Sequence, residues 1–418
     1  MGMKTCFRWS AFISACLAML SLVIVANYFD LIFTFPHRRP INSSAPRIRE
    51  RGKQDKFLQD NSRRRELNGT FNHIPLDNPG QQAMIKHDPN APPVHHVAFI
   101  KVHKAASTSI QNIFYRYGYH NDLVMVQPVR TTGTKWFLPV EREMFLPPPR
   151  GQTSFDIMSI HATYNRKAFE TILPKDSVYI GIVREPFKQF ASCVKYYHLN
   201  KILRIPGSNP VRKFLLDAKD QMNLSPNPRV FNTQSRDLGF PVKYMFPYNE
   251  YKFSNFLQQL DRELDLVLVV ERFDESVVLL RRLLNWEVKD VILASLNSRI
   301  SHPRLHFGAT EEMLLKQISL HDYALYDFFA KKLQDKIDQQ PHDFNDELVL
   351  YKQIKIKYHK FCLSIQKQDY TVVKVLSFER SAWSKPFNVT TNDCALLHMN
   401  ERQFSQMLKL KMGHSITK

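Results

Sequence analysis

The sequence predicts an α/β fold in which a mostly parallel sheet is flanked by helices. Short apolar runs rich in Val and Ile recur along the chain, and three of them are followed by a segment with the spacing of an amphipathic helix. Alternating strands and helices of this kind form parallel sheets with both faces covered. With 418 residues, 44% of them hydrophobic, the chain can bury a core of that size.

The N-terminal segment is predicted to lie outside that fold. Residues 9–29 contain no charged side chain and match the roughly 20 apolar residues that a bilayer-spanning helix needs. The run is longer than the apolar core of a cleaved signal peptide, so we predict a retained signal-anchor with residues 1–8 as a cytoplasmic tail. Residues 30–92, rich in Pro, Arg, Asn and Gln without a period, indicate a flexible stem before a folded domain at 93–418.

The first strand and helix of the domain enclose a candidate anion-binding loop. Residues 96–103 form a β-branched apolar run, and after residue 109 apolar side chains repeat at the spacing of one helix face. The loop between them consists of Lys104, Ala105, Ala106, Ser107, Thr108 and Ser109. Backbone N–H groups at a helix N-terminus, the helix dipole and one ammonium group can together bind a phosphate.

Two other interpretations compete for this loop. An ordinary strand-to-helix junction can carry the same residues without binding a ligand. A Walker-type loop needs the pattern G-x-x-x-x-G-K-[ST], and residues 96–109 contain no glycine. The sequence therefore disfavours an ATPase or a nucleotide kinase.

A second strand and helix carry two further candidate anion-binding residues. Residues 177–183 form a buried-strand run that ends at Arg184, and Pro186 suits the first turn of the following helix. The guanidinium of Arg184 can bind an anionic group, and Ser192, eight residues later, can add a hydroxyl. The alternative is a surface pair between Arg184 and Glu185, with Ser192 facing the core.

Further strand runs extend the same pattern. One run, residues 155–161, ends at His161, and another, residues 264–270, precedes a segment with apolar side chains on one helix face. Ligands of parallel α/β sheets bind beyond the carboxyl ends of the strands. Lys104, His161 and Arg184 are therefore expected to lie at one edge of the sheet.

Cysteine spacing and net charge limit the metal sites, disulfides and partners that can be expected. The chain has no C-x-x-C pair or His/Cys cluster at metal-ligand spacing, so no metal site is predicted. If the domain is lumenal, Cys362 and Cys394 are the natural disulfide partners, because two other cysteines precede or lie in the anchor, and Cys193 is expected as a buried thiol. The formal charge of +19 suits an anionic partner such as a nucleotide, an acidic glycan or a nucleic acid, without choosing among them.

The two anion-binding segments resemble those of a known enzyme class. Lys104 to Ser109 resembles the 5'-phosphosulfate-binding loop of sulfotransferases that use 3'-phosphoadenosine-5'-phosphosulfate (PAPS). Arg184 with Ser192 resembles their 3'-phosphate-binding strand and helix, and the strand before His161 is similar to the one that delivers a catalytic histidine in Golgi sugar 2-O-sulfotransferases. The resemblance implies the sulfotransferase fold, a P-loop-like sheet, with PAPS as co-substrate and no metal.

Segments further along the chain resemble one branch of that class. Residues 264–276 and 323–329 are similar to galactose 3-O-sulfotransferases, which include the galactosylceramide enzyme. The resemblance runs from about residue 95 to about residue 412. It implies sulfuryl transfer to the 3-OH of galactose in a glycolipid or glycoprotein glycan, by a type II Golgi membrane protein with a lumenal catalytic domain. Residues 199–256, rich in Pro, Asn and Tyr, are expected to be irregular acceptor-binding loops.

The resemblance implies separate roles for the catalytic candidates. His161 is expected to accept the proton of the sugar hydroxyl, since an imidazole pKa near 6.5 suits a base near neutral pH. Lys104 is expected to stabilise the charge on the leaving 5'-phosphate oxygen. The sequence has His103 where many sulfotransferases have proline, and Ala105 and Ala106 where many have Ser-Gly. His103 is therefore a second candidate for the base.

Two alternatives to galactose 3-O-sulfation remain. One is a sulfotransferase acting on uronic acid or hexosamine in glycosaminoglycans. The other is a membrane protein that binds polyanions through its basic surface without catalysis; its affinity would fall steeply with salt and would not depend on a 3'-phosphate. Nucleic acid is not expected as a partner.

Overall fold

A computed structural model describes the protein. The described residues are 85–88, 90–129, 140–198, 209–221, 230–293, 305–365 and 373–414. The predicted tail (1–8), anchor (9–29) and most of the stem lie outside them. Within these ranges, none of the helices combines the length and the apolar character that a bilayer crossing requires.

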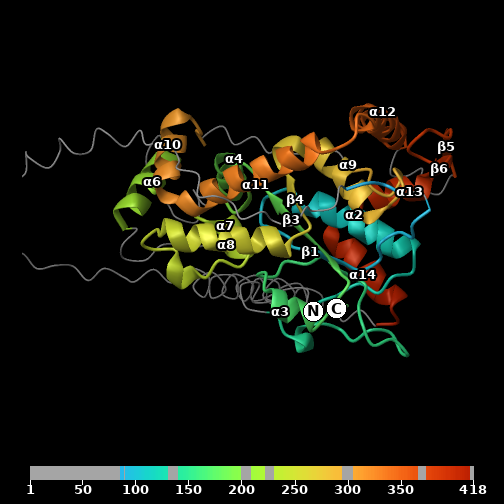
Figure 1. Ribbon diagram of the computed structural model, residues 1–418, viewed down its shortest axis with the longest axis horizontal. Helices are drawn as coiled ribbons and strands as arrows, with labels where there is room; N and C mark the ends of the chain where they lie inside the picture. The colour runs from blue at the N-terminus through green and yellow to red at the C-terminus, as the bar shows by residue number, and fades with distance from the viewer. Residues whose placement is uncertain are drawn as a thin grey trace, which may run out of the picture. The chain divides into compact units, whose positions relative to one another are not determined.

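Four parallel strands form the central sheet, in the order β2-β1-β3-β4. Their bounds are β1 (Val97–Phe99), β2 (Ile157–Met158), β3 (Val178–Val183) and β4 (Leu266–Val269). Figure 1 labels β1, β3 and β4 at the centre of the molecule. Ala98 pairs with Met158 on one side and with Tyr179 on the other. The strands are almost completely buried, as their near-continuous apolar sequences require in a sheet covered on both faces. The predicted parallel α/β class is confirmed.

The three predicted strand-helix units are present. The helices that follow β1, β3 and β4 are α2 (Ser107–His120), α4 (Pro186–Tyr196) and α9 (Phe273–Leu284). Phe114 of α2 packs on Phe99 of β1 with ring centroids 5.2 Å apart. Pro186 occupies the first turn of α4, and the carboxylate of Glu185 accepts hydrogen bonds from the first backbone N–H groups of that helix.

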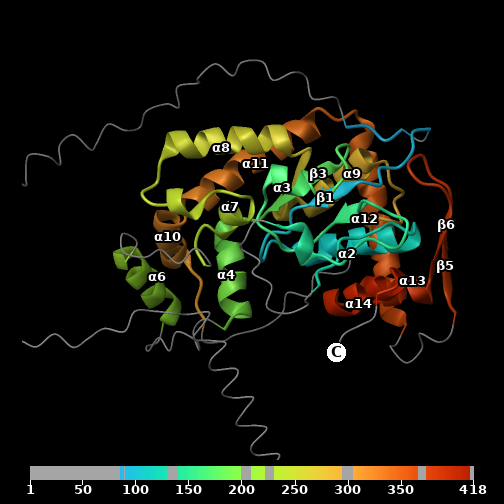
Figure 2. The ribbon, with the colours of Figure 1, turned by 90° about the horizontal axis from the view of Figure 1, so that it is seen from below.

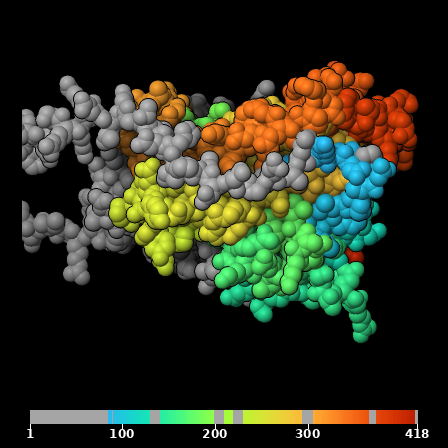
Figure 3. Space-filling view, viewed as in Figure 1, coloured from blue at the N-terminus to red at the C-terminus, as the bar shows by residue number. Residues whose placement is uncertain are grey.

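Helices cover both sides of the sheet, as Figure 2 shows. On one side lie α8 (Glu250–Glu263) and α11 (Leu320–Asp338), and on the other lie α2, α13 (Thr391–His398) and α14 (Glu401–Lys411). In the space-filling view, α8 and the segment containing the short helix α3 (Arg166–Glu170) share one face with α11 and α12 (Asp343–Ser364) (Figure 3).

The expectation of irregular structure across residues 199–256 is wrong for the described part of that segment. It contains α6 (Pro210–Gln221), α7 (Thr233–Asp237) and α8. Helix α8 begins after Asn249, whose side chain accepts a hydrogen bond from the N–H of Lys252, and it buries Phe253, Leu257 and Leu260 on one face. That face has a helical period, which the prolines and polar residues nearby obscured.

The C-terminal part adds helices, a two-stranded sheet and one disulfide. It contains α10 (Ala309–Ile318), α11, α12, the antiparallel pair β5 (Val375–Phe378) and β6 (Phe387–Thr390), α13 and α14. Cys362 of α12 is bonded to Cys394 of α13, which confirms the predicted pairing. Cys193 is a buried free thiol, also as predicted, and burial raises its pKa to about 12.

Candidate active site

The loop between β1 and α2 has an unusual backbone. Lys104 (φ 59°) and Ala106 (φ 54°) are both in the left-handed region, which residues other than glycine seldom adopt. Conformations of this kind cluster at functional sites. Ala106 immediately precedes α2, and among the described residues its end of the helix has no side-chain cap. The N–H of Ser109 donates to the Ala106 carbonyl oxygen at 3.0 Å, and the other first-turn N–H groups of α2 can still bind an anion.

The small residues of this loop differ in what they offer a ligand. Ala105 is fully buried, and the hydroxyl of Ser107 donates to the carbonyl oxygen of Val102 at 2.7 Å. Thr108 is exposed and Ser109 is partly exposed. Ser107 is thus placed to offer its backbone N–H, whereas Thr108 and Ser109 can also offer hydroxyls.

The two predicted anion-binding segments lie together. Nη1 of Arg184 donates to the carbonyl oxygen of Lys104 at 3.1 Å, while Nε of Arg184 has no hydrogen-bond partner within the described part of the chain. The ammonium group of Lys104 lies 3.5 Å from the centre of the Tyr196 ring, one turn beyond Ser192 on α4. Burial lowers the pKa of Lys104, and the positive charge of Arg184 adds to this effect.

The two candidate bases are neighbours. The rings of His103 and His161 stack with centroids 4.0 Å apart and an interplanar angle of 18°. Nδ1 of His161 bonds to the carbonyl oxygen of Lys101 at 3.0 Å. Burial lowers the pKa of His161 well below 6.5, and the charge of Lys101 lowers it further. His161 is therefore neutral at neutral pH.

His103 has a different partner, a carboxylate. Oδ2 of Asp237 accepts hydrogen bonds from the backbone N–H of His103 at 2.8 Å and from its Nδ1 at 2.7 Å. Nη2 of Arg236 donates to Oδ1 of Asp237 at 2.9 Å. Burial favours a raised pKa for Asp237, but its interactions with His103 and Arg236 outweigh it and hold this pKa well below its usual range. Asp237 is therefore ionised.

Comparison with protein families decides the class to which this site belongs. The family model described as galactose-3-O-sulfotransferase matches residues 61–375, which is more than half of the chain. The chain belongs to the galactose-3-O-sulfotransferase family. The matched segment includes every residue of the site named above, and the resemblance inferred from the sequence is confirmed.

Individual members of the galactose-3-O-sulfotransferase family are similar over part of their length. Human galactose-3-O-sulfotransferase 3 is 29% identical over 250 residues, which is 59% of this chain and 58% of the relative. Mouse galactose-3-O-sulfotransferase 2 is 27% identical over 281 residues, 65% of this chain and 71% of the relative. Human galactosylceramide sulfotransferase is 26% identical over 219 residues, half of each chain. The chain thus spans a little over half the length of the first relatives it matches.

Helix α7 contributes site residues that were not predicted from the sequence of this galactose-3-O-sulfotransferase family member. Gln234 holds the backbone of Arg184 from both sides: its Oε1 accepts from the Arg184 N–H and its Nε2 donates to the Arg184 carbonyl, each at 2.8 Å. Asp237, on the same helix, holds His103. Residues 232–237 are polar yet buried, and they are flanked by the apolar segments 230–231 and 238–240. Those apolar flanks were the available signal.

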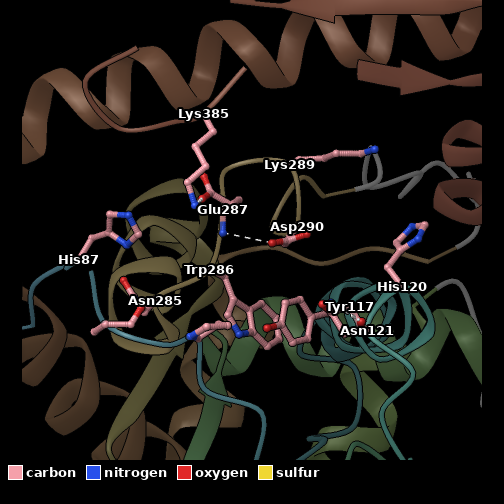
Figure 4. Close-up of a pocket in the computed structure, with 12 residues that line it drawn as sticks. His87, Tyr117, His120, Asn121, Asn285, Trp286, Glu287, Lys289, Asp290 and Lys385 are labelled. Carbon is pink, nitrogen blue, oxygen red and sulfur yellow. Dashed lines mark hydrogen bonds and ion pairs between the residues drawn. The ribbon is translucent and has the colours of Figure 1, made fainter. Parts of the chain in front are cut away.

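A cavity of about 440 Å³ lies at the other end of α2, beside its last residues (Figure 4). Because a 14-residue helix is about 20 Å long, this cavity is remote from the loop at Lys104. Its charged side chains pair with acidic neighbours: Lys385 with Glu287 at 3.0 Å and Lys289 with Asp393 at 3.1 Å. In the described ranges, no three His, Cys, Asp or Glu side chains gather as metal ligands.

Proposed function

We propose that this protein transfers the sulfuryl group of PAPS to the 3-OH of a galactose residue. Membership of the galactose-3-O-sulfotransferase family supports the reaction class. The observation that carries the proposal is the hydrogen bond of 3.1 Å between the Arg184 guanidinium and the Lys104 carbonyl oxygen. It joins the two segments proposed to bind opposite ends of one nucleotide.

The proposed donor site divides between two helices. Lys104, the first-turn N–H groups of α2 and the hydroxyls of Thr108 and Ser109 bind the 5'-phosphosulfate end, where Lys104 stabilises the charge that develops on the leaving oxygen. Arg184 and Ser192 bind the 3'-phosphate, which distinguishes PAPS from ATP. Nε of Arg184, which has no partner among the described residues, supports this role, because a buried donor without a partner is costly unless a ligand accepts from it.

The transfer needs a base for the sugar hydroxyl. His161, the residue favoured by sequence, is neutral at neutral pH and can accept a proton, and His103 stacks directly on it. The protein supplies the base from this pair, and single replacements separate the two. His161→Ala is expected to lower kcat by about 10²-fold or more if His161 is the base. Normal turnover of purified His161→Ala protein would assign the role to His103.

The acceptor we propose is galactose in a glycolipid or a glycoprotein glycan. Relatives are named for galactose and for galactosylceramide, which supports galactose as the sugar. The test is to incubate the full-length protein, in detergent, with radiolabelled PAPS and a panel of galactolipids, galactose-terminated glycans and heparan chains. Label on the galactose 3-OH is the expected result. Label on heparan alone would select the glycosaminoglycan alternative.

A binding measurement separates an enzyme from a protein that only binds polyanions. We expect adenosine 3',5'-bisphosphate to bind more tightly than 5'-AMP, because only the former has a 3'-phosphate for Arg184. Equal affinities that fall together with salt would instead support non-catalytic polyanion binding.

We further propose a type II orientation in the Golgi membrane, with residues 9–29 as the anchor. The Cys362–Cys394 disulfide supports a lumenal domain, since structural disulfides persist in oxidising compartments. Asn388, in an Asn-x-Thr triplet, is exposed on β6 and available for glycosylation. Protease protection of the domain in intact microsomes, lost on adding detergent, is the expected result. Digestion without detergent would reject this orientation.

A further inference from the structure

The contacts of Asp237 fix one form of the His103 ring. An ionised carboxylate only accepts hydrogen bonds, so the Nδ1 of His103 that lies 2.7 Å from Oδ2 must carry a proton. In a neutral imidazole with the proton on Nδ1, Nε2 carries the lone pair. The same Oδ2 also accepts from the His103 backbone N–H at 2.8 Å, which ties the position of the ring to that of its own main chain.

Asp237 is itself held rigidly, because α7 is anchored at both ends. At its start, Asp322 accepts hydrogen bonds from the N–H and the hydroxyl of Ser235, at 2.8 and 2.7 Å. At its end, the Asp237 carbonyl accepts from the Tyr164 N–H at 2.9 Å, and Gly239 (φ +100°) approaches so closely that a Cβ would lie 2.5 Å from the Tyr164 carbonyl oxygen. A carboxylate fixed in this way can hold a base close to one orientation.

The Nδ1 contact of His161 differs from that of His103. Nδ1 of His161 bonds to a neutral backbone carbonyl, and the nearby ammonium group of Lys101 disfavours a second positive charge. Asp237 has the opposite effect on His103, since a carboxylate stabilises the imidazolium that forms when the ring takes up a proton. The two stacked rings are therefore inequivalent as proton acceptors.

We propose that Asp237 is a positioning residue for the sulfuryl transfer: it holds His103 with its proton on Nδ1, so that Nε2 of His103 accepts the proton of the acceptor hydroxyl. In that step the hydroxyl oxygen forms a bond to sulfur, and the bond from sulfur to the 5'-phosphate oxygen breaks. The electron pair leaves with adenosine 3',5'-bisphosphate, and the hydroxyl proton moves to Nε2. The proposal rests on the sulfotransferase function proposed above.

The first experiment replaces Asp237 in the full-length protein by Asn and by Glu. Asp237→Asn is expected to lower kcat by roughly 10²- to 10⁴-fold, because an amide can stabilise the wrong tautomer of His103 and carries no charge. The dissociation constant of adenosine 3',5'-bisphosphate should stay within about twofold, since Asp237 is assigned no nucleotide contact. Asp237→Glu, which keeps the carboxylate, should turn over at least about tenfold faster than Asp237→Asn.

A double replacement tests whether Asp237 acts through His103. If it does, the His103→Ala and Asp237→Asn pair should be no slower than His103→Ala alone. Asp393→Asn is the matched control: Asp393 is a buried carboxylate that completes the capping box of α13 with Thr390, and its loss should lower the unfolding midpoint without changing kcat.

Three outcomes bear on the proposal separately. A wild-type kcat for Asp237→Asn would overturn it. It would also be overturned if adding Asp237→Asn to His103→Ala lowered kcat by the same factor as Asp237→Asn lowers it in the wild type. If Asp237→Asn does not fold, Asp237→Glu decides, since a folded Glu variant as inactive as His103→Ala contradicts rescue by a carboxylate. Absence of transfer by the wild-type protein would instead reject the proposed function.

Discussion

Two groups of cationic side chains in this molecule, one buried and one half-buried, have different partners. Between α9 and α12, the buried side chains of Arg281 and Arg282 both contact the carboxylate of Glu347, which is also buried. At the loop after β1, the ammonium group of Lys104 lies over an aromatic ring, and the guanidinium of Arg184 donates to the backbone carbonyl oxygen of Lys104. Arg282 also pairs with Asp343, so two carboxylates balance the two guanidinium groups between α9 and α12. The contacts named for Lys104 and Arg184 are with uncharged groups.

The difference separates structural charge from charge available to a ligand. A buried ion pair whose members satisfy one another has no affinity left for an added anion, and removing one member leaves the other unpaired. A cation bonded only to neutral groups keeps its attraction for an anion. On this basis the helical part needs its carboxylate to fold, whereas the sheet edge needs its cations to bind a substrate.

The largest effect is expected where the charges are balanced. Glu347→Gln leaves two guanidinium groups buried with one carboxylate fewer, so the free energy of unfolding should fall by about 3–5 kcal/mol. Chemical denaturation of the purified protein measures this. Asp346→Asn, an exposed neighbour on the same helix, should change it by less than about 1 kcal/mol. A small effect of Glu347→Gln would show that pairing does not mark structural charge here.

Lys104→Ala should give the converse result. We expect kcat to fall by about 10²-fold or more, because the leaving oxygen loses its cation, while the free energy of unfolding changes by less than about 0.5 kcal/mol. Lys167→Ala, at an exposed position of α3, is the control and should leave kcat unchanged. Unaltered turnover of Lys104→Ala would end its assignment to the leaving group.

Arg184→Ala should weaken nucleotide binding more than it lowers the stability of the fold. Loss of a charge-assisted hydrogen bond of about 1.5–3 kcal/mol weakens binding roughly 10- to 100-fold. Calorimetry with adenosine 3',5'-bisphosphate should show this loss, whereas 5'-AMP, which lacks the 3'-phosphate, should bind as it does to the wild type. If both ligands lose affinity equally, Arg184 does not recognise the 3'-phosphate.

Much of the fold followed from local sequence patterns. The runs that became β1, β3 and β4 are short, apolar and β-branched, and each is followed by a helix with one apolar face. Lys104 and Arg184 stood out because each directly follows such a run, and the ends of neighbouring parallel strands meet in space.

The contacts made by α7 could not be predicted in that way. His103 and Asp237 are separated by 134 positions, and no local period links residues so far apart. Residues 232–237 are all polar, which is typical of an exposed loop, yet they are buried because their side chains bond to Arg184, His103 and Asp322. Burial of polar residues depends on partners from elsewhere in the chain, and a single sequence does not reveal them.

His321 differs from both groups of cations, because it is a buried basic side chain that is uncharged. It is 1% exposed and packs against Phe240, Tyr248 and Phe253, with ring centroids 4.7 to 5.0 Å away. Neither ring nitrogen has a hydrogen-bond partner within the described residues, and burial lowers the pKa of His321 to about 4. Well above pH 6.5 the ring is neutral in both the folded and the unfolded chain.

As the pH falls from 6.5 toward 4, the unfolded chain takes up a proton at His321 that the folded protein does not, so stability is lost. Between pH 7 and pH 5 this loss should be about 2 kcal/mol. His321→Phe fits the aromatic surroundings and cannot titrate. Between pH 7 and pH 5 its free energy of unfolding should therefore fall by about 2 kcal/mol less than that of the wild type. His342→Phe removes an exposed histidine and should follow the wild-type curve. Parallel curves for His321→Phe and wild type would mean that the folded protein admits a charge at this position.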